Sequence, residues 1–125
     1  MTIADVIADL PRRYDEAVEP FTSAEIDALC ERLQLPRQRF FDEISVEIAR
    51  SFDAGKLNFE AADFAMNDLW TIAVHDDEQL TPLLDEIYNA FDAGEYASPL
   101  RPPHDPIETH TRPMVKRILE RLASN

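Results

Sequence analysis

Cysteine and glycine are scarce in this chain of 125 residues, which contains one cysteine, Cys30, and two glycines. One cysteine rules out an intrachain disulfide and a zinc site built from several cysteines of this chain. Two isolated glycines rule out the glycine-rich loops that cradle nucleotide phosphates. The chain also lacks an apolar run of about 18 residues, as a membrane helix needs, and its first residues lack a basic leader. We therefore expect a cytoplasmic protein without a membrane partner.

Lysine and arginine are absent from residues 57–100, a segment that carries many aspartates and glutamates. The formal net charge of the whole chain is -13, and most of it arises in this segment. A negative field of this size repels nucleic acid and anionic lipid, and it steers basic proteins toward the chain at salt-dependent rates. The charge therefore predicts a protein partner with a basic surface and no nucleic-acid ligand.

Apolar residues recur with helical spacing along almost the whole chain. Thr22 and Glu25 form a capping box, Asn58 can cap the segment that follows it, and Thr81 precedes Pro82 as an N-cap and first helical residue. The predicted helices cover about 3–18, with a kink or break at Pro11, then 22–35, 37–54, 59–74, 82–93 and 114–122. A proline-rich connector at 98–106 precedes the last helix. These signals predict an all-α fold, a single domain at 1–125 formed by a bundle of five to seven helices.

One short segment recurs in the chain: EIARSFDAG at 47–55 is matched by EIYNAFDAG at 86–94. A glycine directly after a helical stripe is typical of a left-handed C-terminal cap, which we expect at Gly55 and Gly94. Phe52 and Phe91 are predicted to be buried anchors in the last turns of their helices. We interpret the recurrence as a reused helix-terminating signal, with a duplicated helical unit as the alternative.

The helix predicted at 59–74 has aromatic and acidic side chains on the side opposite its core face. A central helix packed on more than one side would explain this pattern. The functional alternative is an exposed recognition face, because aromatic anchors rimmed by charge are typical of protein interfaces. The candidate partner-binding residues are Glu60, Asp63, Phe64, Asp68, Trp70, Asp76, Asp77 and Glu78. If neighbouring helices enclose Phe64, the site is expected instead at Asp85 and Asp92 on the next helix.

Few residue patterns in this sequence are typical of a catalytic site. Cys30 lies in an apolar helical stripe with no histidine at a suggestive spacing, which favours a buried structural thiol over a nucleophile. The best enzymatic alternative is a divalent-metal-dependent nucleotide pyrophosphohydrolase, in which carboxylates one helical turn apart bind Mg²⁺. The pairs with this spacing are Glu16 with Glu19 and Glu60 with Asp63. Such pairs arise readily by chance among 25 acidic residues, and we expect no catalytic residue, metal or cofactor.

A resemblance to known proteins rests on two segments, IYNAFDAGEY at 87–96 and DPIETHTRP at 105–113. Together they resemble stretches of small, acidic, all-helical bacterial proteins of unknown function, some of which are similar to immunity proteins. The resemblance implies a protein-binding module that occupies the basic surface of a cognate partner such as a toxin. It assigns no catalytic residue, and it leaves homo-oligomerisation open.

Overall fold

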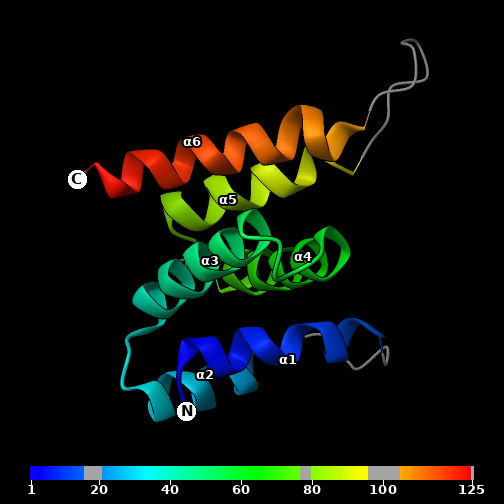
Figure 1. The fold of residues 1–125 in the computed structure, drawn as a ribbon. Coiled ribbons are helices and arrows are strands. Elements are labelled where there is room, and N and C mark those ends of the chain that lie inside the picture. The colour runs from blue at the N-terminus through cyan, green and yellow to red at the C-terminus, as the bar shows by residue number, and fades with distance from the viewer. Residues whose placement is uncertain (16–20, 77–79, 96–104, 125) are drawn as a thin grey trace.

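The computed structural model describes residues 1–15, 21–76, 80–95 and 105–124. Its helices are α1 (Ile3–Asp15), α2 (Ser23–Leu33), α3 (Arg37–Asp53), α4 (Phe59–His75), α5 (Pro82–Asp92), the short π-helical segment η1 (Ile107–Thr111) and α6 (Arg112–Ala123). Figure 1 shows these helices in three layers, with α1 and α2 at one end, α3 and α4 in the middle, and α5 and α6 at the other end. The predicted all-α fold is confirmed.

Side chains cap the helices at the predicted positions. The Thr22 hydroxyl accepts a hydrogen bond from the Glu25 N–H at 3.1 Å, and Oδ1 of Asn58 accepts one from the Ala61 N–H at 2.8 Å. The Thr81 hydroxyl caps α5 in the same manner. Each cap satisfies one of the N–H groups that a first helical turn leaves without a partner. These polar residues therefore fix where α2, α4 and α5 begin.

Pro11 lies inside α1, which continues to Asp15 as one helix. Of the two predicted alternatives at this residue, a kink or a break, the break is therefore wrong. An interior proline removes one backbone hydrogen bond of the helix. Burial of Val6, Ile7 and Leu10 on one face of α1 supplies the tertiary packing that keeps the helix continuous.

The third helix is the centre of the core. It packs against α1, α2, α4, α5 and α6, and seven of its residues are buried. Phe52 and Phe91 are both buried, as predicted, and their rings meet edge to face with centroids 5.2 Å apart. Phe59 of α4 adds a third ring, 6.1 Å from Phe91. The ends of α3 and α5 and the start of α4 therefore share one aromatic cluster.

The two matching segments lie on helices that run parallel and in register. At one end, the Thr81 hydroxyl donates to Oδ1 of Asp42 across 39 residues, with an oxygen-to-oxygen distance of 2.5 Å. At the other end, the contact between Phe52 and Phe91 joins residues with the same separation in sequence. Figure 1 shows α3 and α5 running in the same direction in adjacent layers. This register is the one expected if a helical unit had been duplicated.

The helix α3 ends in a left-handed cap, as predicted. Gly55 has a φ of 76° and donates its N–H to the Phe52 carbonyl at 3.0 Å. The Lys56 N–H bonds to the Ser51 carbonyl at 2.9 Å, which completes a Schellman motif. A glycine adopts this backbone without the steric cost that a Cβ atom imposes.

The prediction of a left-handed backbone at Gly94 is wrong. Among the described residues, positive φ values occur only at Gly55 and Gln34. Gly94 is required for a different reason: a Cβ atom there would overlap the Thr111 hydroxyl and approach the Phe59 ring to 3.0 Å. Both segments nevertheless end their helices at the same position, α3 at Asp53 and α5 at Asp92, and the Gly94 N–H donates to the Phe91 carbonyl at 3.0 Å as the Gly55 N–H does to that of Phe52. Only the left-handed glycine differs between the two copies.

Candidate functional site

The helix α4 packs against α1, α3 and α5. Its core face consists of Ala61, Ala62, Ala65, Met66, Leu69 and Ala73, all of them buried. Glu60, Thr71 and Val74 are exposed on the opposite side. The helix is therefore packed on more than one side, and its outer side is exposed to solvent. A recognition role for that outer side stays a prediction.

One flank of α4 forms an aromatic face with α5, which we define as Trp70, Val74, Asp85 and Tyr88. The Trp70 and Tyr88 rings are stacked, with centroids 4.6 Å apart and planes 15° apart. The indole N–H of Trp70 donates to Oδ1 of Asp85 at 3.0 Å. Val74, one helical turn beyond Trp70, is 36% exposed. The stack and the hydrogen bond hold the indole in one orientation beside an accessible apolar side chain.

A carboxylate cluster lies at the start of α4 and the end of α5, and it consists of Glu60, Asp63, Asp92 and Glu95. Burial, together with the charges of the other three carboxylates and a side-chain hydrogen bond to Glu95, raises the pKa of Asp63 to about 7. The close packing of Gly94 on Phe59 brings the end of α5 to this position. Protonated and ionised forms of Asp63 therefore coexist near neutral pH.

The other flank of α4 faces α1 and the start of α2. The Phe64 ring meets Tyr14 edge to face with centroids 5.9 Å apart, and Tyr14 remains 40% exposed. Oδ2 of Asp68 accepts the Phe21 N–H at 3.1 Å. Burial raises the pKa of Asp68 to about 6, against the opposing effect of that hydrogen bond. Phe64 and Asp68 therefore attach α1 and α2 to α4 and lie apart from the aromatic face.

Asp76 lies at the end of α4, where it forms an ion pair with Arg37. Oδ2 of Asp76 also accepts a hydrogen bond from the Ser23 hydroxyl at 3.1 Å. The carboxylate thus connects α4 to the starts of α2 and α3. Asp77 and Glu78, the remaining candidate residues, lie outside the described residues.

The eight candidate residues therefore divide into separate groups. Trp70 belongs to the aromatic face, Glu60 and Asp63 to the carboxylate cluster, and the remaining described candidates to contacts with α1, α2 and α3. Tyr88 was absent from the candidate list because its spacing places it on the apolar side of α5. Tyr88 and Trp70 lie on different helices. The spacing of residues within one helix therefore cannot predict that their rings are in contact.

The residues considered for catalysis or metal binding are Cys30 and the carboxylate pairs. Cys30 is buried, and burial raises the pKa of its thiol, as expected of a structural cysteine. Glu16 and Glu19 lie outside the described residues. Within the described ranges, no three histidine, cysteine, aspartate or glutamate side chains are arranged to hold a metal ion. The nucleotide hydrolase remains a hypothesis without a geometric observation in its favour.

Basic residues of α6 contact carboxylates of α3 and α5. Arg121 donates to both carboxylate oxygens of Glu86 at 2.8 and 2.5 Å, and Nζ of Lys116 lies 3.1 Å from Oδ1 of Asp53. These pairs place part of the positive charge of the chain against its own acidic residues.

No helix in the described part of the chain has the length and apolar content needed to cross a membrane.

No protein family, curated protein or solved structure matches this chain. Its function has to be inferred from the geometry and charge described above.

Proposed function

We propose that this protein is an acidic protein-binding module that binds a basic cognate partner in the manner of an immunity protein. The observation that carries the proposal is the aromatic face, where Val74 is exposed beside the stacked rings of Trp70 and Tyr88. Interface hot spots are enriched in tryptophan and tyrosine, held rigidly and surrounded by polar groups. Asp85 supplies a carboxylate at the centre of this face and also orients the indole.

The carboxylate cluster gives the same side of the molecule a preference for cations. The pKa of Asp63 is raised to about 7 because the carboxyl group is partly buried and lies near the carboxylates of Glu95, Asp92 and Glu60. A lysine or arginine of the partner placed beside the cluster would stabilise the ionised form and release the proton. Partner binding is therefore expected to be tighter at pH 8 than at pH 6. Titration of groups on the partner is measured separately as the control.

The experiment is capture of a partner with the intact protein, followed by binding kinetics with four variants, the fourth being Phe64→Ala on the other flank of α4. Trp70→Ala is expected to accelerate dissociation, with a loss of about 2 kcal/mol of binding free energy, as for an interface hot spot. Asp85→Lys is expected to slow association and to flatten its salt dependence. Glu31→Lys, a charge reversal at an exposed residue of α2, is the matched control.

The comparison between these variants decides the outcome. If Glu31→Lys slows association as much as Asp85→Lys does, the partner senses only net charge and the aromatic face is not the site. If Phe64→Ala weakens binding while the unfolding midpoint stays constant, the site lies on the flank of α4 that faces α1. A captured protein whose binding is insensitive to Trp70→Ala would also contradict the proposal.

A further inference from the structure

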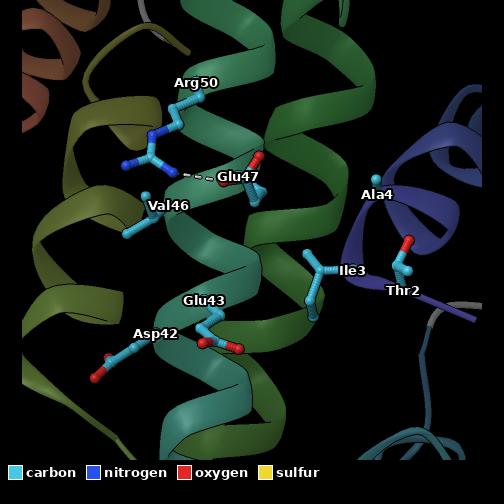
Figure 2. Close-up of a pocket in the computed structure, with 8 residues that line it drawn as sticks. All are labelled: Thr2, Ile3, Ala4, Asp42, Glu43, Val46, Glu47 and Arg50. Carbon is cyan, nitrogen blue, oxygen red and sulfur yellow. Dashed lines mark hydrogen bonds and ion pairs between the residues drawn. The ribbon is translucent and has the colours of Figure 1, made fainter. Parts of the chain in front are cut away.

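The carboxylate of Asp85 in the aromatic face differs from neighbouring carboxylates in its partners. Figure 2 shows a different arrangement in the hollow between α1 and α3, where Arg50 lies 2.6 Å from Oε1 of Glu47. Glu86, the residue after Asp85, is likewise paired with Arg121. Among the described residues, no lysine or arginine forms an ion pair with Asp85. Its charge is therefore open to a cation of another molecule.

The free bonding positions of Asp85 lie beside the stacked rings. An ionised carboxylate has about four lone-pair positions, and the Trp70 indole N–H occupies one of them. An indole N–H lies in the plane of its ring, so the carboxylate lies at the edge of the Trp70 ring and not over its face. Trp70, Asp85 and Tyr88 are each partly exposed. One cation can therefore contact the stacked rings and the Asp85 carboxylate together.

This combination of rings and carboxylate fits a guanidinium group better than an ammonium group. A guanidinium is planar, so it can lie along an aromatic ring while the N–H groups at its edge donate to a carboxylate. It is also more weakly hydrated than an ammonium, so it loses less on leaving water. A lysine ammonium is a compact, strongly hydrated charge without a planar surface. The chemistry of the aromatic face therefore favours arginine over lysine.

Three arginines of this chain each contact an aromatic ring and a carboxylate at once. The guanidinium carbon of Arg112 lies 4.6 Å from the centroid of the Phe52 ring, and Nε of the same residue lies 2.9 Å from Oε2 of Glu108. The other two combinations are Arg13 with Phe21 and Glu25, and Arg37 with Phe41 and Asp76. The aromatic face supplies the rings and the carboxylate of the same combination.

We propose that the aromatic face recognises an arginine side chain of the partner, with its guanidinium on the Trp70–Tyr88 stack and bound to the Asp85 carboxylate. Val74, exposed one helical turn beyond Trp70, offers an apolar contact to the methylene groups of that arginine. The inference rests on the proposed function, because it names the residue type that the partner places on the aromatic face.

Trp70 is the only tryptophan of the chain, so its fluorescence and its indole N–H resonance both report on the aromatic face. The probes are two short synthetic peptides, one with several arginines separated by glycine and serine, the other with lysine in their place. In the ¹⁵N-labelled full-length protein, the arginine peptide is expected to shift the indole signal and to bind about fivefold more tightly than the lysine peptide. Equal affinity of the two peptides, or an indole signal that the arginine peptide leaves unchanged, overturns the inference.

Two variants separate the Asp85 carboxylate from net charge. Asp85→Asn keeps an oxygen that can accept the indole N–H but loses the ionised group, so the affinity for the arginine peptide is expected to fall about fivefold. Glu31→Gln removes the same charge from an exposed residue of α2, and it is expected to change the affinity less than about twofold. Equal weakening by both variants means that the peptide responds to net charge alone, which overturns the inference. Circular dichroism of each variant establishes that the fold is retained.

The arginine inference and the proposed function fail in different ways. If the captured partner loses affinity with Trp70→Ala but tolerates replacement of each of its arginines by lysine, the arginine inference is overturned and the proposed function stands. If binding of the captured partner is insensitive to Trp70→Ala, the proposed function itself is contradicted.

Discussion

Replacing Asp63 with asparagine is expected to stabilise the protein at alkaline pH, although the change removes a charge from a helix. In the folded state the pKa of Asp63 is raised to about 7, whereas the ordinary value is 3.8. A carboxyl group whose pKa is raised on folding contributes its stability fully below pH 4, and that contribution is lost as the pH rises to 7. Above pH 7 the ionised carboxylate is partly buried and lies near the carboxylates of Glu95, Asp92 and Glu60, and both conditions are unfavourable.

The magnitude follows from the pKa difference and from the exposure of the group. A difference of about three pKa units corresponds to about 4 kcal/mol if no solvent screening applies. Asp63 is only half-buried, so water offsets much of this cost. We therefore expect Asp63→Asn to raise the free energy of unfolding by about 1 to 2 kcal/mol at pH 8 and by much less at pH 5.

Urea denaturation of the wild type and of Asp63→Asn at several values between pH 5 and pH 8 measures this difference. Glu31→Gln is the matched control, because Glu31 is exposed on α2 and lies apart from the cluster. The difference between the wild type and Asp63→Asn should grow with pH, while the difference for the control stays constant. If Asp63→Asn destabilises the protein at pH 8, or if its effect is independent of pH, the proposed repulsion within the cluster is refuted.

Four further predictions concern the helix ends, the core and ligand exclusion. Gln34 has a φ of 57° at the end of α2, so Gln34→Gly should raise the free energy of unfolding by about 0.5 to 1 kcal/mol in urea titrations. In the same assay, Gly55→Ala should cost about 1 kcal/mol through backbone strain, and Gly94→Ala about 1 to 3 kcal/mol through overlap with packed neighbours. Truncating Phe52 or Phe91 to alanine should cost about 3 to 5 kcal/mol, and unchanged unfolding midpoints would contradict their role as core anchors. DNA and RNA should fail to bind with submicromolar affinity in fluorescence anisotropy, because the chain has a net charge of -13.

The helical fold could be predicted from the sequence because its signals are local. The capping residue Thr22 and its partner Glu25 lie within one helical turn. Their spacing in the sequence is therefore enough to predict where the helix starts. The buried face of each helix can also be predicted, because apolar residues recur along the sequence at helical spacing. This spacing predicts Phe52 and Phe91 as core residues. Gly94 was misassigned because its requirement comes from Thr111, which belongs to a different helical segment.

The arrangement of the candidate site depends on contacts between distant parts of the chain. Asp68 and Trp70 are two residues apart, so helical geometry alone places them about 200° apart around α4. Helical spacing could not show which helix packs against each of them. Asp68 is held by the backbone of Phe21, 47 residues earlier, and Trp70 is stacked on Tyr88 of α5. The sequence therefore indicates which aromatic and acidic side chains lie on the outer side of α4. Only the packing of α1 and α5 against α4 shows which of these side chains lie together.

The attachment of α2 has a consequence for local unfolding. Only Ile26 and Cys30 of this helix are buried, and its main packing partner is α3. Much of its attachment comes from ion pairs, of Glu25 with Arg13 and of Asp27 with Arg37. Because salt weakens such pairs and leaves the apolar core largely unaffected, we expect α2 to open separately from the core. Its amides should exchange with solvent at a lower free energy than those of α3, and the gap should widen as ionic strength rises.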